Sequence, residues 1–135
     1  TGHRYEKFGN GHPDLVPYQA FEARDGYFIV ACLTNAFFRR LCAGLGREEL
    51  LEDERFATNV ARCRNRQAIV DILQEIFLTD TRDHWIRLCT DNDLPACRVN
   101  DLNDLFEMEQ LKAIGSVADW EHPTQGPFRT MNVPI

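Results

Sequence analysis

A chain of 135 residues with 44% hydrophobic and 27% charged residues fits one globular domain, and it is unlike a disordered or fibrous protein. The formal net charge of −6 argues against a nucleic-acid-binding protein, which needs a basic face for the phosphates. The longest apolar run, residues 27–33, is far shorter than the roughly 20 residues that a membrane span needs. We therefore expect no nucleic-acid partner and no membrane partner.

The cysteines indicate a reducing compartment. There are five of them, an odd number, and none forms a Cys-x-x-Cys pair. Cys32, Cys42 and Cys89 lie in apolar runs, where a thiol stays protonated, so a structural role is favoured over a nucleophilic one. The sequence has no recognisable signal or transit segment, and we expect a cytoplasmic protein. Because the opening residues read as interior loop sequence, we also expect a piece excised from a longer chain.

The first third of the chain predicts an irregular arm followed by a β-hairpin. Residues 1–17 are rich in Gly, His, Pro and Asn and show almost no apolar periodicity. Tyr18–Ala23 and Tyr27–Leu33 are β-favouring runs, and Asp25-Gly26 between them can supply the positive φ of a tight turn. We expect two antiparallel strands.

Capping residues and helical periodicity predict a helical middle. Thr34 can cap a helix that stops at Gly46, and a short helical turn is expected over Arg47–Leu51. Apolar residues at helical spacing predict one long helix from Thr58 to Leu78. Thr81 is expected to cap the next helix, which ends at Asn92-Asp93.

The last third returns to short strands. We expect a strand at Ala96–Val99, helices at Leu102–Phe106 (capped by Asp101) and Met108–Ala113, and strands at Ile114–Trp120 and Pro127–Met131. Strands that come early and late with helices between them favour an α+β fold, with a two-layer arrangement of a small antiparallel sheet and several helices. We assign residues 1–17 to a glycine-containing arm and residues 18–135 to a single domain.

Single motifs identify few candidate metal-binding or anion-binding residues. The four histidines lie on separate expected elements, and no Cys or His pair has zinc-site spacing, so we expect no metal and no covalently bound cofactor. Arg62 and Arg66 stand at i and i+4 and could clasp a diphosphate; alternatively they form a solvated face or pair with an acid such as Asp71. The same two interpretations hold for Arg39-Arg40.

The joint pattern of several motifs is more specific. Its members, in chain order, are Gly9-Asn10 with His12-Pro13, Pro17-Tyr18-Gln19 with Phe21, Asp25-Gly26-Tyr27-Phe28-Ile29, Phe38 to Gly46, Asp53 to Asn59, Arg62 to Arg66, Asp93 to Val99, and His122-Pro123 with Gly126. In this order and spacing they resemble the family III CoA-transferases, also called the CaiB/BaiF family. The resemblance runs from about Phe8 to Ile135.

The resemblance implies a small domain inserted into a large Rossmann-like domain, with two such chains interlocked as a homodimer. Members of the family move CoA from an acyl-CoA to a carboxylic acid acceptor through an Asp of the large domain, or racemise an acyl-CoA by acid and base groups. That Asp lies upstream of the matched region. We therefore assign no catalytic residue to this chain and expect it to be inactive in isolation.

The resemblance also implies which residues lie near the substrate. The family has a glycine-rich loop that covers the active site, and Gly9, Asn10, Gly11, His12 and Pro13 correspond to it, with two glycines in place of a longer run. That departure disfavours formyl-CoA or oxalate as substrate and favours a carnitine-transferase-like or racemase-like member. His12, Tyr18 and Gln19 could border the acyl pocket or merely shape the turn into the first strand. Arg24 could contact the phosphates of the CoA thioester.

Two other interpretations stay open. The chain could derive from an α-methylacyl-CoA racemase-like enzyme, because the small domain does not separate the two reactions. It could also be a free-standing module that binds CoA thioesters or a protein partner.

Overall fold

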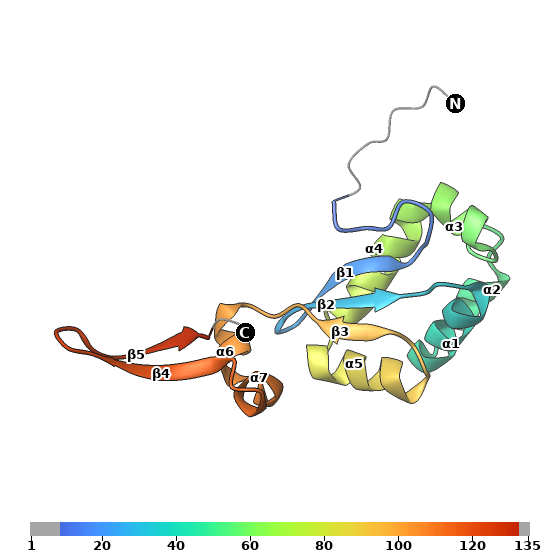
Figure 1. Cartoon of the computed structure of the whole chain (residues 1–135). Coiled ribbons are helices and arrows are strands. Elements are labelled where there is room, and N and C mark those ends of the chain that lie inside the picture. Colours follow the sequence, from blue (N-terminus) through green and yellow to red (C-terminus); the bar gives the residue numbers. More distant parts are fainter. Residues whose placement is uncertain (1–8, 133–135) are drawn as a thin grey trace, which may run out of the picture. The chain divides into compact units, whose positions relative to one another are not determined.

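The computed structural model describes residues 9–132, which fold as five strands and seven helices (Figure 1). The contacts divide the chain into two compact units, the first of which ends at Val99 and the second of which begins at Asn100. The expected boundary at residue 17 lies inside the first unit, and the assignment of residues 18–135 to one domain stays a prediction.

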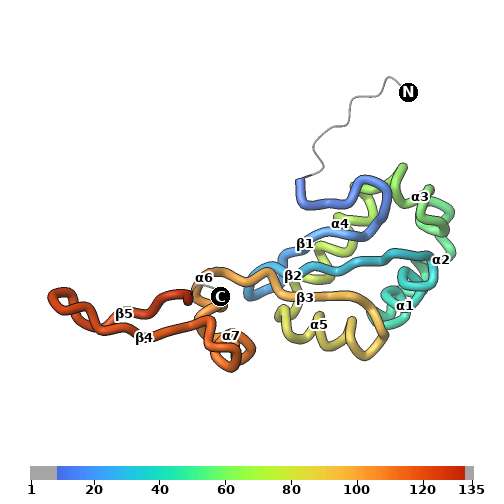
Figure 2. The backbone as a smooth tube through the Cα atoms, in the orientation of Figure 1, coloured from blue at the N-terminus to red at the C-terminus, as the bar shows by residue number. Residues whose placement is uncertain are grey.

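The first unit is built on a three-stranded antiparallel sheet. Its strands are β1 (Tyr18–Ala23), β2 (Gly26–Ala31) and β3 (Ala96–Arg98), in the order β1-β2-β3 that Figure 2 follows along the chain. The predicted hairpin is confirmed, because β1 and β2 pair in register from Tyr18↔Ala31 to Ala23↔Gly26. Gly26 has a φ of +133°, a conformation that glycine adopts without a steric cost.

The described part of this unit has five helices, and two of them begin at the predicted caps Thr34 and Thr81. They are α1 (Asn35–Leu45), α2 (Glu49–Glu52), α3 (Asn59–Arg64), α4 (Arg66–Phe77) and α5 (Arg82–Asp91). The hydroxyl oxygens of Thr34, Thr58 and Thr81 each accept a hydrogen bond from the backbone N–H three residues later. Gly46 ends α1 in the left-handed conformation.

The long helix expected from Thr58 to Leu78 is wrong, because the chain breaks it at Asn65 into α3 and α4. The Asn65 side chain donates a hydrogen bond to the Ala61 carbonyl at 2.9 Å, a local bond that competes with helix continuation. The break lets α3 direct Arg62 into the core.

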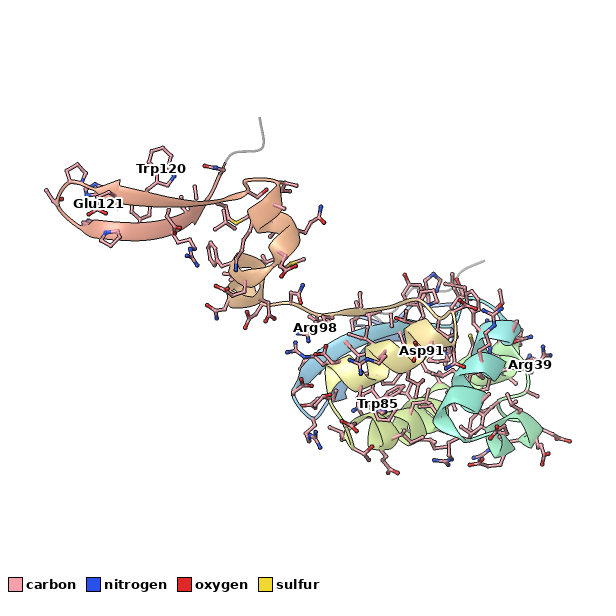
Figure 3. All side chains as sticks on the ribbon, turned by 90° about the horizontal axis from the view of Figure 1, so that it is seen from below. Arg39, Trp85, Asp91, Arg98, Trp120 and Glu121 are labelled. Atoms are coloured by element: carbon pink, nitrogen blue, oxygen red, sulfur yellow. The ribbon has the colours of Figure 1, made fainter. Side chains whose placement is uncertain are left out.

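Helices α4 and α5 cover one face of the sheet: α4 contacts β1, and α5 contacts β2 and β3 (Figures 1 and 3). The core between them is centred on Phe77, whose ring packs edge-on against Phe21 and Phe28 at 5.0 Å and against Trp85 at 5.4 Å. The Trp85 indole N–H donates to the Phe77 carbonyl at 2.7 Å, so this large residue is buried with its polar atom bonded. The α+β fold is confirmed.

The second unit contains α6 (Leu102–Glu107), α7 (Glu109–Ala113), β4 (Val117–His122) and β5 (Gly126–Met131). Asp101 caps α6 as predicted, in a reciprocal capping box with Asp104. The two strands form an antiparallel hairpin of their own. In the part of the chain that the structure describes, none of the helices is long and apolar enough to cross a membrane.

Arg62 is the one charged side chain of residues 9–132 that is fully buried. Its guanidinium donates to the carbonyl of Val16 at 2.6 Å, to the carbonyl of Phe56 at 2.8 Å and to the side-chain oxygen of Asn35 at 3.0 Å. It also lies 4.1 Å from the centre of the Phe38 ring. Burial lowers the pKa of Arg62, but these oxygens and the ring face compensate the buried cation.

We expect Arg62→Met to lower the free energy of unfolding by about 3–5 kcal/mol, because it leaves buried oxygens without a donor. Urea titration followed by circular dichroism measures the change. Arg64→Met, on the exposed side of the same helix, is the matched control and is expected to change stability by less than about 0.5 kcal/mol. Equal effects of the two substitutions would contradict a structural role for Arg62.

Candidate functional site

The glycine-containing loop lies against the first residues of β1. Its Gly9 has a φ of +62°, with open space around the Cα atom. The His12 N–H donates to the Tyr18 carbonyl at 2.9 Å, and the two rings stack with their centres 5.3 Å apart. The Asn10 side-chain oxygen accepts the N–H of Ala20 at 3.2 Å. The structure therefore brings the predicted loop residues and Tyr18 together.

Side chains of α3 and α4 hold the second half of this loop. Arg66 donates to the carbonyls of His12 at 2.9 Å and Pro13 at 2.7 Å. The Asn59 amide donates to the Asp14 carbonyl at 2.7 Å and accepts the N–H of Val16 at 3.1 Å. Each of these bonds is a backbone contact, so the loop conformation from residue 12 to residue 16 is fixed by its anchors.

These contacts give Arg62 and Arg66 a role that neither of the two interpretations described. The diphosphate clasp is wrong for Arg62, because a fully buried guanidinium with three bonded oxygens cannot meet an external ligand. Arg66 uses its guanidinium to bind loop carbonyls. The pair is thus an anchor for the loop, a role that i, i+4 spacing alone does not reveal.

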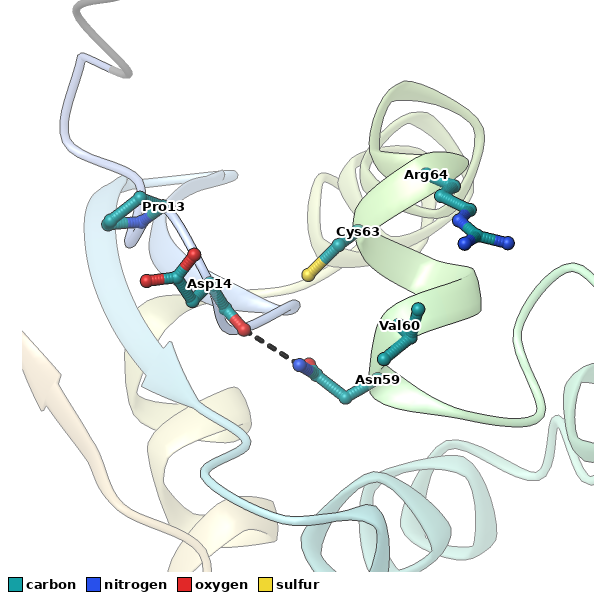
Figure 4. Close-up of a pocket in the computed structure, with 6 residues that line it drawn as sticks. All are labelled: Pro13, Asp14, Asn59, Val60, Cys63 and Arg64. Atoms are coloured by element: carbon teal, nitrogen blue, oxygen red, sulfur yellow. Dashed lines mark hydrogen bonds between the residues drawn. The ribbon is translucent and has the colours of Figure 1, made fainter. Parts of the chain in front are cut away.

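A pocket of about 360 Å³ separates the loop from α3, and the sequence did not predict it. It is lined by Pro13, Asp14, Asn59, Val60, Cys63 and Arg64. Figure 4 shows the Cys63 sulfur directed toward the loop, whereas the Arg64 side chain extends away from it.

A second pocket, of about 310 Å³, lies on the face of the sheet opposite the aromatic core. Its lining is mainly apolar and consists of Tyr18, Ile29, Ala31, Pro95, Ala96 and Cys97. The register explains the grouping, because Tyr18 pairs with Ala31 and Ile29 pairs with Cys97, so their side chains share one face. Tyr18 also stacks on His12, which makes it the residue that joins this pocket to the loop.

The structure does not bring all the predicted residues into this group. Gln19 follows Tyr18 in β1, so strand alternation places its side chain on the other face, with Phe21. Arg24 lies beyond the far end of β1, roughly 20 Å along the strand from Tyr18. Its guanidinium is 3.5 Å from the Asp80 carboxylate, and its side chain is 61% exposed.

The cysteines differ in their exposure. Burial raises the pKa of Cys32, Cys42 and Cys89 to about 12, so these thiols stay protonated and unreactive near neutral pH. Cys63 is half-buried in the first pocket and Cys97 is exposed in the second. Within residues 9–132, no group of three or more His, Cys, Asp or Glu side chains could hold a metal ion.

We expect iodoacetamide at pH 8 to alkylate Cys63 and Cys97 in the native chain and to leave the three buried thiols unmodified. A shift from 9.0 to about 12 lowers the thiolate fraction about 1,000-fold at a given pH. Unfolding should expose all five thiols, and mass spectrometry counts the adducts. Rapid native alkylation of Cys89 would contradict this assignment.

The raised pKa of the buried thiols also makes the stability of the fold depend on pH. Because their pKa is higher in the folded state than in the unfolded state, their contribution to the free energy of unfolding is full below pH 9 and falls as the pH rises toward 12.

The chain matches a known protein family and several known proteins. The family model described as CoA-transferase family III matches residues 1–135. Among curated proteins, the chain is 33% identical over 121 residues to the succinyl-CoA:glutarate CoA-transferase of Homo sapiens, covering 90% of this chain and 28% of that protein. It is also 33% identical over 115 residues to the succinate–glutarate CoA-transferase of Agrobacterium fabrum, covering 85% of this chain and 29% of that one.

A solved structure supports the same family. A CaiB/BaiF family protein from Brucella suis has a TM-score of 0.86 and 37% identity, and the match covers 100% of this chain and 34% of that one. The chain spans less than a third of the length of the two curated relatives named above. Because the family model covers every residue, the chain belongs to CoA-transferase family III.

Proposed function

We propose that this chain is the small domain of a family III enzyme that transfers CoA between an acyl-CoA and a carboxylic acid acceptor. In this proposal the chain covers the active site, the catalytic Asp belongs to a large domain outside these residues, and the full-length protein is a homodimer. The single observation that carries the proposal is the His12–Tyr18 stack, which joins the glycine-containing loop to an apolar pocket. A relative's name pairs succinyl-CoA with glutarate, which gives a first probe.

The pocket on the open face of the sheet suits the apolar part of a thioester. Its volume of about 310 Å³ is at the lower end of the range for small-molecule sites. The loop beside it is anchored from His12 to Val16, while Gly9 keeps the freedom of a left-handed glycine. We infer that Gly9, Asn10 and Gly11 close over the bound thioester and that Tyr18 contacts its acyl end. Gln19 and Arg24 are weaker candidates for contact with the thioester, because neither side chain lies with the loop, Tyr18 and the second pocket.

The racemase interpretation shares the thioester and differs in the reaction. The two relatives named above are both CoA-transferases, which favours transfer. A free-standing thioester-binding module uses the same pocket and is distinguished by the coding sequence around these residues.

We expect a CoA thioester analogue to protect Cys97 from alkylation. The probe is a CoA thioether with a carboxypropyl group, which has the shape of succinyl-CoA but cannot acylate a thiol. In the 135-residue chain, saturating probe should slow iodoacetamide modification of Cys97 several-fold, because Cys97 lines the proposed pocket. Quantitative mass spectrometry measures both reactive thiols in one sample.

Cys63 is the internal control, because it lines the other pocket and should react at an unchanged rate. Protection of Cys63 with Cys97 unchanged would place the ligand elsewhere and contradict the proposed site. Absence of any binding in calorimetry at millimolar probe would count against the thioester function itself.

We also expect the isolated chain to transfer no CoA from succinyl-CoA to glutarate, because the nucleophilic Asp of the family lies outside it. Mass spectrometry of the reaction mixture detects glutaryl-CoA directly. Turnover at rates typical of enzymes would show that the chain carries its own catalytic group.

A further inference from the structure

His12 makes a hydrogen bond that only a neutral imidazole can make. The Asp14 backbone N–H donates to the Nδ1 atom of His12 at 3.1 Å. A neutral histidine has one ring nitrogen that accepts and one that donates, whereas both nitrogens donate in the charged form. Nδ1 is therefore the accepting nitrogen, and the proton of the neutral ring lies on Nε2. Protonation of His12 would place an N–H group against the Asp14 N–H group and break this bond.

The same ring supports the wall of the second pocket. It stacks on the Tyr18 ring with only 10° between the two planes, and Tyr18 lines that pocket. The His12 backbone is held on both sides, because its N–H donates to the Tyr18 carbonyl at 2.9 Å and its carbonyl accepts from Arg66 at 2.9 Å. With the backbone held, the bond to Nδ1 sets the rotation of the ring over Tyr18. Both rings are only half-buried, so protons from the solvent reach His12.

A second His-Pro pair makes the same local bond in another setting. In the turn between β4 and β5, the Thr124 N–H donates to Nδ1 of the exposed His122 at 3.3 Å. The Thr124 hydroxyl lies 3.2 Å from the same nitrogen. The local bond thus recurs at both His-Pro pairs, whereas His12 adds a stack on a residue that lines a pocket.

We propose that His12 is a positioning residue for thioester binding. Its neutral imidazole bonds Asp14 and orients the Tyr18 ring at the second pocket, and protonation releases Asp14 and lets the imidazole rotate over Tyr18. The inference rests on the proposed function in taking the second pocket as the thioester site. His12 thus acts through Tyr18, and the affinity for the thioester falls as the solution becomes acidic.

The charged and titratable groups around this ring act in opposite directions. The Asp14 carboxylate of the same loop and the face of the Tyr18 ring from β1 favour an imidazolium. The Arg66 guanidinium from α4, which binds the His12 carbonyl, disfavours it. On α3, Cys63 and Arg64 line the first pocket beside Asp14. These charges set the pH at which the ring gains its proton, but the acceptor for Asp14 is lost at that pH in every case.

Two amide resonances test the bond without any thioester. ¹H–¹⁵N spectra of the 135-residue chain from pH 8 to pH 5 span the range in which histidine changes its charge. We expect the Asp14 amide proton to shift upfield on acidification with the same midpoint as the His12 imidazole. In His12→Asn this shift should disappear, because an asparagine side-chain oxygen accepts the N–H two residues later at every pH. The Thr124 shift, which reports His122, should be the same in both proteins.

Binding of the carboxypropyl CoA thioether tests the positioning role. Between pH 7.5 and pH 5.5, we expect the dissociation constant of the unsubstituted chain to rise about five-fold more than that of His12→Asn, the effect of one lost hydrogen bond. Titration of the probe itself affects both proteins alike. The matched control His122→Asn should keep the full pH dependence. His12→Phe keeps an aromatic ring without an acceptor, so it should bind about five-fold more weakly at pH 7.5 and lack the extra pH dependence.

Two results would overturn the proposal. One is an Asp14 amide that does not follow the titration of His12, and the other is the same pH dependence of binding in the unsubstituted chain and in His12→Asn. A thioether that binds at neither pH would contradict the proposed thioester site, and the positioning role would fail with it. The amide titration then still shows whether the bond to His12 depends on its charge, so the two failures are distinguished.

Discussion

The buried guanidinium of Arg62 is the constraint on which the first unit depends. Its three acceptors come from segments far apart in sequence: Val16 before β1, Asn35 at the start of α1, and Phe56 before α3. Arginine suits this position, because its planar fork offers five donors in fixed directions. A hydrophobic side chain could fill the same volume, but it would leave the three oxygens unpaired inside the protein. Arg62 is therefore one of the side chains, with Asn59 and Arg66, that set the position of the loop relative to the helices.

The position of the loop in turn defines the candidate site. Because Arg62, Asn59 and Arg66 hold the backbone of residues 12–16, the His12 ring is fixed where it stacks on Tyr18. Gly9, Asn10 and Gly11 precede this anchored segment, and the Asn10 side chain accepts the N–H of Ala20 at 3.2 Å. Arg62 and Arg66 thus contribute to the candidate site by positioning the loop.

Local signals predicted most of the elements. Thr34, Thr58 and Thr81 act as N-caps and Gly46 as a C-cap because capping needs only residues a few positions apart. The burial of Arg62 was missed, since it depends on oxygens that the fold brings from other segments. The break at Asn65 was also missed, although the hydrogen bond from its side chain to the Ala61 carbonyl is local. The order of motifs predicted the loop and Tyr18. It could not predict that Arg24 pairs with Asp80, which lies on a distant segment. The opposite facing of Gln19 and Tyr18 does follow from alternation along the predicted strand, but the motif order does not use it.

The run of apolar residues in β2 indicates how the two faces of the sheet are covered. An antiparallel strand with one face in water usually alternates apolar and polar residues, but Tyr27, Phe28, Ile29 and Val30 are apolar without interruption. Phe28 and Val30 face the helices, and Tyr27 and Ile29 face the side of the sheet that these helices do not cover. Such a pattern is typical of a strand that is covered on both faces. The first unit therefore presents apolar side chains of β2 on the side of its sheet that α4 and α5 leave uncovered, and this is the side on which the second pocket lies.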